Sequence, residues 1–292
     1  MNTIEQTIVS REQVESYQRD GYLVVRGVIP VEEAIAWRDH FMELHAAGPV
    51  EGYFTPIPLE ETGGDLLRAY PRMLHPHKWD ETCKEYTLDG RLHAILRELL
   101  GEEPLAAQSM LYFKPPGARG QALHQDDYYL KTQPRPCLAA WMALDETDAQ
   151  NGGLSVVPGS HNLPVLCPHP ADLRTSFTIE EVDVPEELAP APIELGIGDV
   201  LFFNGSVIHG SGPNTSTDRF RRSFICHYVA SSTDSMSSWY SPLRSFDDQP
   251  VEVGTTPGGG PCGTEELAAM RAGIVAQMDL AKVGLEQGAI GL

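Results

Sequence analysis

Hydrophobic residues follow two different patterns along this chain, and the change between them predicts its organisation. In the first hundred residues apolar positions recur every three or four residues, which predicts helices over 10–20, 30–47 and 89–101. A β-branched run at 22–26 predicts a strand after the first helix. From about residue 105 short apolar runs alternate with Pro and Gly, which predicts strands in AQSMLYFK, CLAAWMALD, LSVVPGS, DVLFFNG and RSFICHYVA.

Short strands without helices between them favour a β sandwich or jelly roll over a parallel sheet. We therefore predict a mainly β fold with flanking helices and a jelly-roll core. At 292 residues the chain is expected to form a single domain, 1–292. Its helices would occupy 10–101, its β core about 105–230, and a closing amphipathic helix about 264–286.

Charge and cysteine content narrow the possible functions. A formal net charge of -20 repels phosphate backbones and anionic lipids, so neither nucleic-acid nor membrane partners are expected. The sequence contains no run of 18 apolar residues, so no membrane span is predicted. It also lacks a basic region followed by an apolar stretch near residue 1, so export is not predicted. Five scattered cysteines without a C-x-x-C pair indicate a reducing cytoplasm, with neither a disulfide framework nor a thiolate zinc site. A small-molecule partner is expected, and composition leaves the oligomeric state open.

The most informative residues are His124, Asp126 and His209. Alternate side chains of a strand share a face, so His124 and Asp126 are expected to point the same way. His209 follows a predicted strand closely, within the Gly- and Ser-rich run VIHGSGPN. Two imidazoles and one carboxylate can hold one face of an iron(II) ion and leave the opposite face open. H-x-D alone is a weak signal, and the distal histidine followed by an arginine-bearing strand strengthens it.

An arginine near that metal site would suit a dicarboxylate co-substrate. A 2-oxo acid can occupy two open positions on the ion and leave one for dioxygen. The far carboxylate of 2-oxoglutarate then needs a bidentate cation, which arginine provides better than lysine. Arg221 stands 12 positions after His209, as expected for the next antiparallel strand. Arg219 and Arg222 are alternatives, although Arg222 would face the other way in a regular strand.

Other residues near these motifs are assigned supporting roles. His161 is expected to fix a turn, and His227 to be a packed strand histidine rather than a ligand. The segments 48–80 and 163–192 are long enough to act as lids, and such loops usually carry the choice of substrate. The residues 127–129, which follow the H-x-D motif, are expected to edge the mouth of the site.

These motifs, taken together, resemble one known family. HQD, WMALD, NGGLSVVPGSH, GDVLFF, HGSGPN and FR closely resemble the phytanoyl-CoA dioxygenase family of iron(II)/2-oxoglutarate oxygenases, which includes ectoine hydroxylase. The similarity extends from about Val14 to Ala230, and the motifs are specific as a set. It implies a double-stranded β-helix core with iron(II), 2-oxoglutarate and O2 as cofactors. It also implies His124, Asp126 and His209 as the iron ligands.

The resemblance further assigns co-substrate contacts. Arg221 matches the 2-oxoglutarate anchor, and Ser211 matches a hydroxyl that assists the same carboxylate. Trp141 matches an aromatic of the co-substrate pocket, although a strand aromatic is as readily part of the core. Three residues of the preceding strand fall where relatives place polar co-substrate contacts, and these are Gln108, Tyr112 and Lys114. Tyr112 stands where some relatives have an amide.

We therefore predict an iron(II)- and 2-oxoglutarate-dependent dioxygenase. It would hydroxylate an unactivated C–H bond of a small metabolite or natural-product intermediate, with release of succinate and CO2. Desaturation, cyclisation or epoxidation would use the same residues. Asp126 argues against a halogenase, because the resemblance places a small residue there in halogenases. One alternative is a non-catalytic metal-binding jelly-roll protein. Another is a cupin-type metal-dependent isomerase or hydrolase, and this enzyme would not need Arg221.

Overall fold

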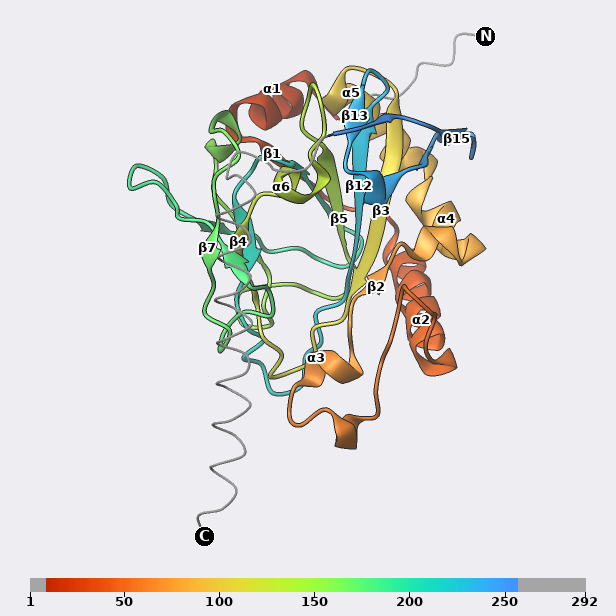
Figure 1. Cartoon of the computed structure of the whole chain (residues 1–292), viewed down its shortest axis with the longest axis vertical. Coiled ribbons are helices and arrows are strands. Elements are labelled where there is room, and N and C mark those ends of the chain that lie inside the picture. The colour runs from red at the N-terminus through yellow and green to blue at the C-terminus, as the bar shows by residue number, and fades with distance from the viewer. Residues whose placement is uncertain (1–8, 257–292) are drawn as a thin grey trace.

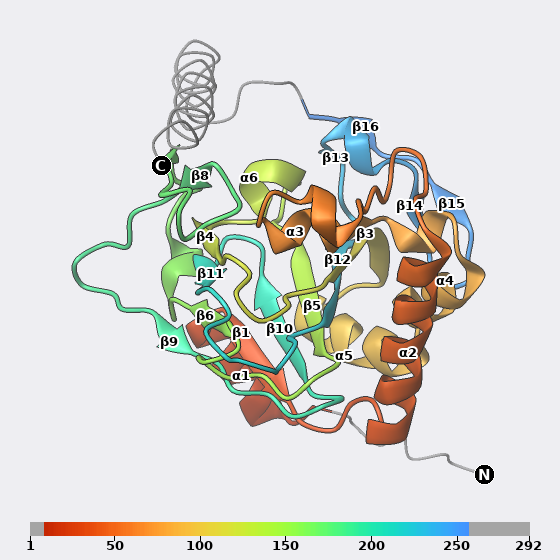
Figure 2. The ribbon, with the colours of Figure 1, turned by 90° about the horizontal axis from the view of Figure 1, so that it is seen from below.

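The computed structural model describes residues 9–256, and most of their strands belong to two antiparallel sheets (Figure 1). The larger sheet has eight strands in the order β1-β10-β5-β12-β3-β14-β15, with β2 beside β3. The smaller sheet has the order β4-β11-β6-β9. Seen from below, β4, β11 and β6 lie on one side and β10, β5, β12 and β3 on the other, with α2 and α5 outside the larger sheet (Figure 2). The predicted mainly β, jelly-roll fold is therefore confirmed.

The bounds of the described elements are as follows. The α-helices are α1 Arg11–Asp20, α2 Val31–Ala47, α3 Leu66–Ala69, α4 Glu81–Thr87, α5 Gly90–Leu100 and α6 Asp127–Leu130. The strands are β1 Tyr22–Val25, β2 Met73–Leu74, β3 Pro104–Tyr112, β4 Gln121–His124, β5 Leu138–Ala143, β6 Leu154–Val156, β7 His169–Pro170, β8 Glu180–Glu181, β9 Ala191–Pro192, β10 Val200–Asn204, β11 His209–Ser211, β12 Ser223–Ala230, β13 Ser235–Met236, β14 Leu243–Arg244, β15 Pro250–Val251 and β16 Gly254–Thr255. Short 3-10 helices span Leu59–Glu61, Pro76–Lys78, Ser160–Asn162 and Ser238–Tyr240.

The first helices begin and end where their capping residues predict. At α1 the Ser10 hydroxyl accepts from the backbone N–H of Gln13, whose side chain accepts from the Ser10 N–H in return. This reciprocal pair satisfies two backbone donors that the helix itself leaves free. The helix ends at Gly21, whose φ of 82° is a left-handed conformation that glycine adopts at little cost.

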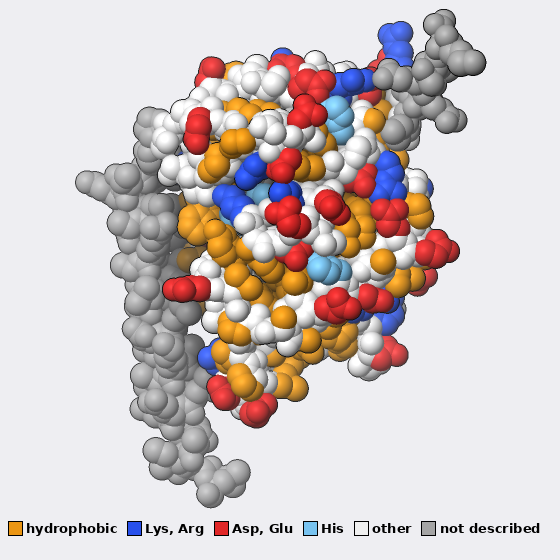
Figure 3. Space-filling view, turned by 90° about the vertical axis from the view of Figure 1, so that its right-hand side faces the viewer, with side chains coloured by type: hydrophobic (Ala, Val, Ile, Leu, Met, Phe, Trp, Pro, Cys, Tyr) orange, Lys and Arg blue, Asp and Glu red, His pale blue; other side chains and the backbone are white. Residues whose placement is uncertain are grey.

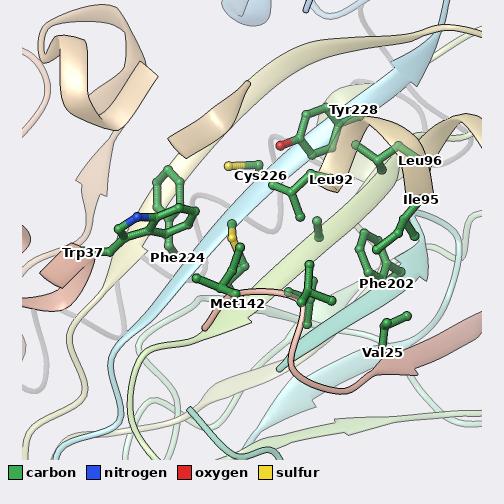
Figure 4. Packing of buried hydrophobic residues seen from close by; sticks show 14 of the residues in the cluster. Val25, Trp37, Leu92, Ile95, Leu96, Met142, Phe202, Phe224, Cys226 and Tyr228 are labelled. Carbon is green, nitrogen blue, oxygen red and sulfur yellow. The ribbon is translucent and has the colours of Figure 1, made fainter. Parts of the chain in front are cut away.

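Helix α5 holds the N-terminal helices against the outer face of the larger sheet. Leu92, Ile95 and Leu96 are fully buried, and they pack towards the strand residues Phe202 and Tyr228 (Figure 4). Burying each of these aliphatic side chains contributes about 1.5–3 kcal/mol to the free energy of unfolding. This packing holds α5 against the larger sheet, which carries part of the site.

The central strands of the larger sheet are buried on both faces. Along β10, Val200 and Phe202 belong to the cluster under the helices, whereas Leu201 and Phe203 belong to the cluster between the sheets. Alternate side chains of a strand point to opposite faces, so both registers must be apolar here. This explains why the strands appear in the sequence as unbroken hydrophobic runs.

Several local predictions differ from the structure. Helix α4 was not predicted, because its polar sequence ETCKEYT carries no apolar stripe; Asp80 caps it by accepting from the N–H of Cys83. The segment 48–80, predicted as a long loop, contains α3, β2 and two 3-10 turns. The predicted helix over about 264–286 lies outside the described residues.

The cysteines agree with the prediction at three of the described positions. Cys83, Cys137 and Cys226 are buried free thiols. Cys167 is disulfide-bonded, so the expectation of reduced thiols throughout is wrong at this position. Sequence spacing does not reveal which cysteines meet in space.

The surface reflects the acidic composition. Acidic side chains are scattered over the face that carries α2 and α4, among basic and hydrophobic ones, rather than gathered in one patch (Figure 3). Among the described residues, no helix has the length and apolar character needed to cross a membrane.

Two buried histidines precede α4. His75 has a left-handed φ of 47°, and neither of its ring nitrogens has a hydrogen-bond partner among the described residues. His77 lies next to it, with Nδ1 at 2.6 Å from the hydroxyl of Ser109. Burial lowers the pKa of each imidazole to about 3, so both rings are neutral in the folded protein.

These neutral rings predict a loss of stability in mild acid. Unfolded histidine has a pKa of about 6.5, so below that pH the unfolded chain binds more protons than the folded one. The stabilisation is therefore complete above about pH 6.5 and is lost as the pH falls towards 3. Between pH 7 and pH 5 we expect the free energy of unfolding to fall by about 2 kcal/mol per histidine.

The substitution His75→Asn tests this, because asparagine tolerates the left-handed conformation. Urea unfolding of the variant at pH 7 and pH 5 should show a loss about 2 kcal/mol smaller than that of the wild type. Equal losses in the two proteins would contradict the argument.

Candidate metal centre

The three predicted ligands come together between neighbouring elements. The register of β4 and β11 places His124 directly opposite His209, with ring centroids 4.2 Å apart. Oδ1 of Asp126 lies 3.5 Å from Nε2 of His124 and 3.6 Å from Nε2 of His209. All three residues are buried, and their ligand atoms lie within 4.8 Å of one another. Two nitrogens and one oxygen at this spacing can share one cation.

The prediction that His124 and Asp126 share one face of a strand is wrong. Strand β4 ends at His124, and Asp126 has φ -62° and ψ -34°, which is helical. The carbonyl of Asp126 accepts from the N–H groups of Tyr129 and Leu130, so this residue opens α6. The carboxylate is therefore brought beside the imidazole by the turn into α6 and not by the alternation of a strand.

Hydrogen bonds set the tautomers of the two histidines. Nδ1 of His124 lies 2.9 Å from the carbonyl of Ala122, and Nδ1 of His209 lies 3.0 Å from the carbonyl of Val207. A carbonyl only accepts, so both Nδ1 atoms carry the proton and both Nε2 atoms keep a lone pair. Burial also lowers the pKa of His209 to about 4, which keeps this ring neutral, as a metal ligand must be.

His227 supports the carboxylate ligand from behind. This buried residue of β12 places Nε2 at 2.9 Å from Oδ2 of Asp126, which leaves Oδ1 beside the two ligand imidazoles. Burial opposes ionisation of Asp126, but the surrounding histidines outweigh it and hold the pKa of the carboxyl well below its usual range. His227 is thus the packed strand histidine that was predicted. Its contact with Asp126 could not be read from the sequence.

The variant His227→Leu is expected to weaken iron(II) binding by about 10- to 100-fold, because outer hydrogen bonds hold a ligating carboxylate in place. A competitive titration against a ferrous chelator measures this. His227→Gln, which retains an N–H donor, should recover part of the affinity. Equal iron affinities in the leucine variant and the wild type would show that the contact does not position Asp126.

Arg221 is the only one of the three candidate arginines without a carboxylate partner among the described residues. Arg219 bonds Asp148 at 2.7 Å, and Arg222 bonds Asp145 at 2.7 Å. Of these three arginines, Arg221 is therefore the one left to bind an anion.

Neutral groups hold the Arg221 side chain in place. Its Nε donates to the carbonyl of Gly152 at 3.1 Å and one terminal nitrogen donates to the hydroxyl of Ser223 at 2.8 Å. The guanidinium carbon lies 5.4 Å from the centre of the Trp141 ring. Only 3% of Arg221 is exposed, and burial lowers its pKa to about 10, so it stays protonated at neutral pH. Arg221 precedes β12 rather than lying within it.

One cavity joins the metal ligands to Arg221. Its lining includes the predicted contacts Ser211, Trp141 and Tyr112. Trp141 is both part of the core cluster between the sheets and a wall of this cavity, so the two interpretations of this residue both hold. Gln108 lines an adjoining cavity of about 370 Å3 over His124 and Asp126.

Lys114 lies outside both cavities. Its ammonium group donates to the carbonyls of Gly152 and Gly212 at 3.1 and 2.7 Å and to the hydroxyl of Ser211 at 2.8 Å. An ammonium group has three hydrogens, and all three are used here. Lys114 therefore holds Ser211 in place, and the direct co-substrate contact assigned to it is not favoured by this geometry.

Sequence reasoning missed Gln121. Its amide nitrogen lies 3.0 Å from Nε2 of His124, and the residue lines both cavities. It precedes His124 by three positions in β4, a spacing that carries no recognisable signal. A metal ion on His124 would take the lone pair that this amide contacts.

Fold and site together define a jelly-roll protein with a candidate metal centre of two histidines and one carboxylate, the ligand set of non-haem iron(II) oxygenases. Residues 17–223 match the family described as Phytanoyl-CoA dioxygenase (PhyH), and the chain belongs to this family. The resemblance seen in the sequence motifs is therefore confirmed.

Similar proteins extend over most of the chain. Phytanoyl-CoA dioxygenase domain-containing protein 1 of Danio rerio is 27% identical over 274 residues, which covers 77% of this chain and 91% of the relative. A probable alpha-ketoglutarate-dependent hypophosphite dioxygenase of Stutzerimonas stutzeri is 28% identical, with 75% and 78% of the two chains covered.

Solved structures share the fold at lower identity. EctD from S. alaskensis with bound Fe superposes with a TM-score of 0.65 at 22% identity, covering 88% of this chain and 91% of the other. EvdO2 from Micromonospora carbonacea complexed with 2-oxoglutarate gives 0.61 at 22% identity, covering 76% and 91%.

Proposed function

We propose that this protein is an iron(II)- and 2-oxoglutarate-dependent dioxygenase that oxidises an unactivated C–H bond of a small molecule. The observation that carries the proposal is the pairing, in one cavity, of a three-residue ligand set with a buried arginine that has no acidic partner within residues 9–256. A two-histidine, one-carboxylate set suits iron(II), and an unpaired guanidinium suits the far carboxylate of 2-oxoglutarate.

The protein's residues bind and orient the reactants. His124, Asp126 and His209 would hold the metal on one face, while Arg221 and Ser211 would bind the far carboxylate of 2-oxoglutarate. When bound, iron(II) supplies oxygen activation, coupled to decarboxylation of 2-oxoglutarate to succinate and CO2. Apolar side chains of the larger sheet, including Phe203 and Ile225, line the same cavity and exclude water from the reaction.

Two alternative functions lack a need for Arg221. A cupin-type isomerase or hydrolase would use the same ligands without an anion-binding arginine. A non-catalytic metal-binding protein would need neither Arg221 nor the cavity of about 370 Å3 beside the metal ligands. Hydroxylation is the simplest outcome, and desaturation, cyclisation and epoxidation would use the same residues. The net charge of -20 supports action on a small molecule, without nucleic-acid or membrane partners. A cytoplasmic location is supported by the free thiols of Cys83, Cys137 and Cys226, whereas the disulfide at Cys167 speaks against it.

Co-substrate turnover tests the proposal directly. Purified protein with iron(II), 2-oxoglutarate and air should form succinate slowly even without substrate, and should form none without iron or oxygen. Absence of succinate from protein that binds both iron(II) and 2-oxoglutarate would favour the non-catalytic alternative. Activity that survives loss of Arg221 would favour the isomerase or hydrolase.

A further inference from the structure

The cavity over His124 and Asp126 is lined by two charged side chains of opposite sign that do not neutralise each other. These are Glu180 of β8 and Arg72, which lies just before β2. Neither forms an ion pair with any described residue, in contrast to Arg219 and Arg222, which are both paired with aspartates. Both charges are therefore available to a molecule inside the cavity.

Glu180 is the more unusual of the two. Only 8% of it is exposed, and one carboxylate oxygen accepts a hydrogen bond from the hydroxyl of Tyr129 at 3.1 Å. The second oxygen has no hydrogen bond with any residue in the described part of the chain. The phenol satisfies only one of the two carboxylate oxygens, and Glu180 lines the cavity. A cationic group on a bound molecule would therefore complete this site.

Arg72 supplies the opposite charge. Its guanidinium carbon lies 5.6 Å from the ring centre of Tyr112 and 5.2 Å from that of Phe177. One of its nitrogens donates to the Tyr112 hydroxyl at 3.4 Å. The two rings hold the planar group along the cavity wall while leaving its charge uncompensated. An anionic group with two oxygens, such as a carboxylate or a phosphate, matches its donors.

We propose, resting on the function proposed above, that the substrate is a small zwitterion whose cationic nitrogen is bound by Glu180 and whose anionic group is bound by Arg72. A cavity of about 370 Å3 accommodates a molecule of that size. Because His124 and Asp126 line the same cavity, a molecule held at both charges presents its intervening C–H bonds to the metal centre.

A purely structural role for Glu180 makes different predictions. The Tyr129 hydrogen bond joins α6 to β8 and would serve as a latch whether its acceptor were charged or neutral. Glu180→Gln keeps an acceptor oxygen and removes only the charge, whereas Tyr129→Phe removes the hydrogen bond and keeps the charge. If Glu180 has only a structural role, Tyr129→Phe should impair the protein and Glu180→Gln should not. If Glu180 binds a cation, Glu180→Gln should impair substrate binding.

The experiment measures stimulation of succinate formation above the substrate-free rate. The probes are free amino acids and aminophosphonates, each compared with its N-acetyl derivative and its methyl ester. We expect stimulation only by members that carry both charges. For the best of these, Glu180→Gln and Arg72→Gln should each raise KM by about 10- to 100-fold, the loss of one charge-assisted contact. Glu181→Gln is the matched control, because this neighbour lies outside the cavity and should keep the wild-type KM.

Several outcomes would overturn the inference. These are equal stimulation by the N-acetyl or ester derivatives, no stimulation by any zwitterion, or an unchanged KM in Glu180→Gln alongside a raised KM in Tyr129→Phe. A raised KM for 2-oxoglutarate, rather than for the zwitterion, in Arg72→Gln would also overturn it. The substrate-free reaction of the wild type keeps the two proposals apart. If succinate still forms, only the zwitterion is rejected; if none forms, the proposed function itself fails.

Discussion

Asp126→Ala is expected to abolish succinate formation and to weaken iron(II) binding by at least about 100-fold, more than the loss of an outer contact costs. The change removes the only anionic ligand of the set and leaves two neutral imidazoles. It also removes the acceptor of the His227 hydrogen bond, so a buried imidazole is left without its partner. Iron binding by chelator competition and succinate formation measure the two effects separately.

A surface carboxylate provides the matched control for that variant. The side chain of Asp183 is 92% exposed, and Asp183→Ala should bind iron and turn over as the wild type does. Retention of iron affinity in Asp126→Ala, with a folded protein, would mean that the three side chains do not share one ion. The metal centre proposed here would then be wrong.

Arg221→Ala is expected to raise the KM for 2-oxoglutarate by about 30- to 1000-fold, which corresponds to about 2–4 kcal/mol for one partner of a buried charge pair. Iron affinity should change little, because the guanidinium contacts no metal ligand. Arg221→Lys should recover only part of the loss, since an ammonium group lacks the two parallel donors that match a carboxylate.

Arg222→Ala is the control for position and charge. Arg222 is the next residue along the chain, but its side chain bonds Asp145, so the variant should keep the wild-type KM for 2-oxoglutarate even if it is less stable. A similar rise in KM for both variants would indicate a general disturbance near β12. An unchanged KM in Arg221→Ala would show that another group anchors the co-substrate.

Much of the fold could be predicted because its determinants are local. The capping box at Ser10 and the left-handed Gly21 lie within a few residues of the helix ends that they define. The strands of the larger sheet were recognisable because burial on both faces makes them continuous apolar runs. Helix α4 was missed because its stability comes from the Asp80 cap and from tertiary contacts rather than from an apolar stripe.

The candidate site was predictable only where residue type and spacing carry the chemistry. His124, Asp126, His209 and Arg221 stand out for that reason, even though the strand geometry assumed for Asp126 is wrong. The contacts of Glu180 arise from folding over long sequence distances, since it meets Tyr129 from 51 positions away. Tertiary contacts of this kind leave no recognisable pattern in the sequence.

Arg221 has a consequence for how stable the folded protein is. It is buried and faces no carboxylate of the described chain, so folding alone places its positive charge in an apolar interior. A dianion bound beside it offsets this cost, and mass action then favours the folded state as the concentration of the dianion rises. The purified protein should accordingly unfold at a higher temperature as 2-oxoglutarate is added.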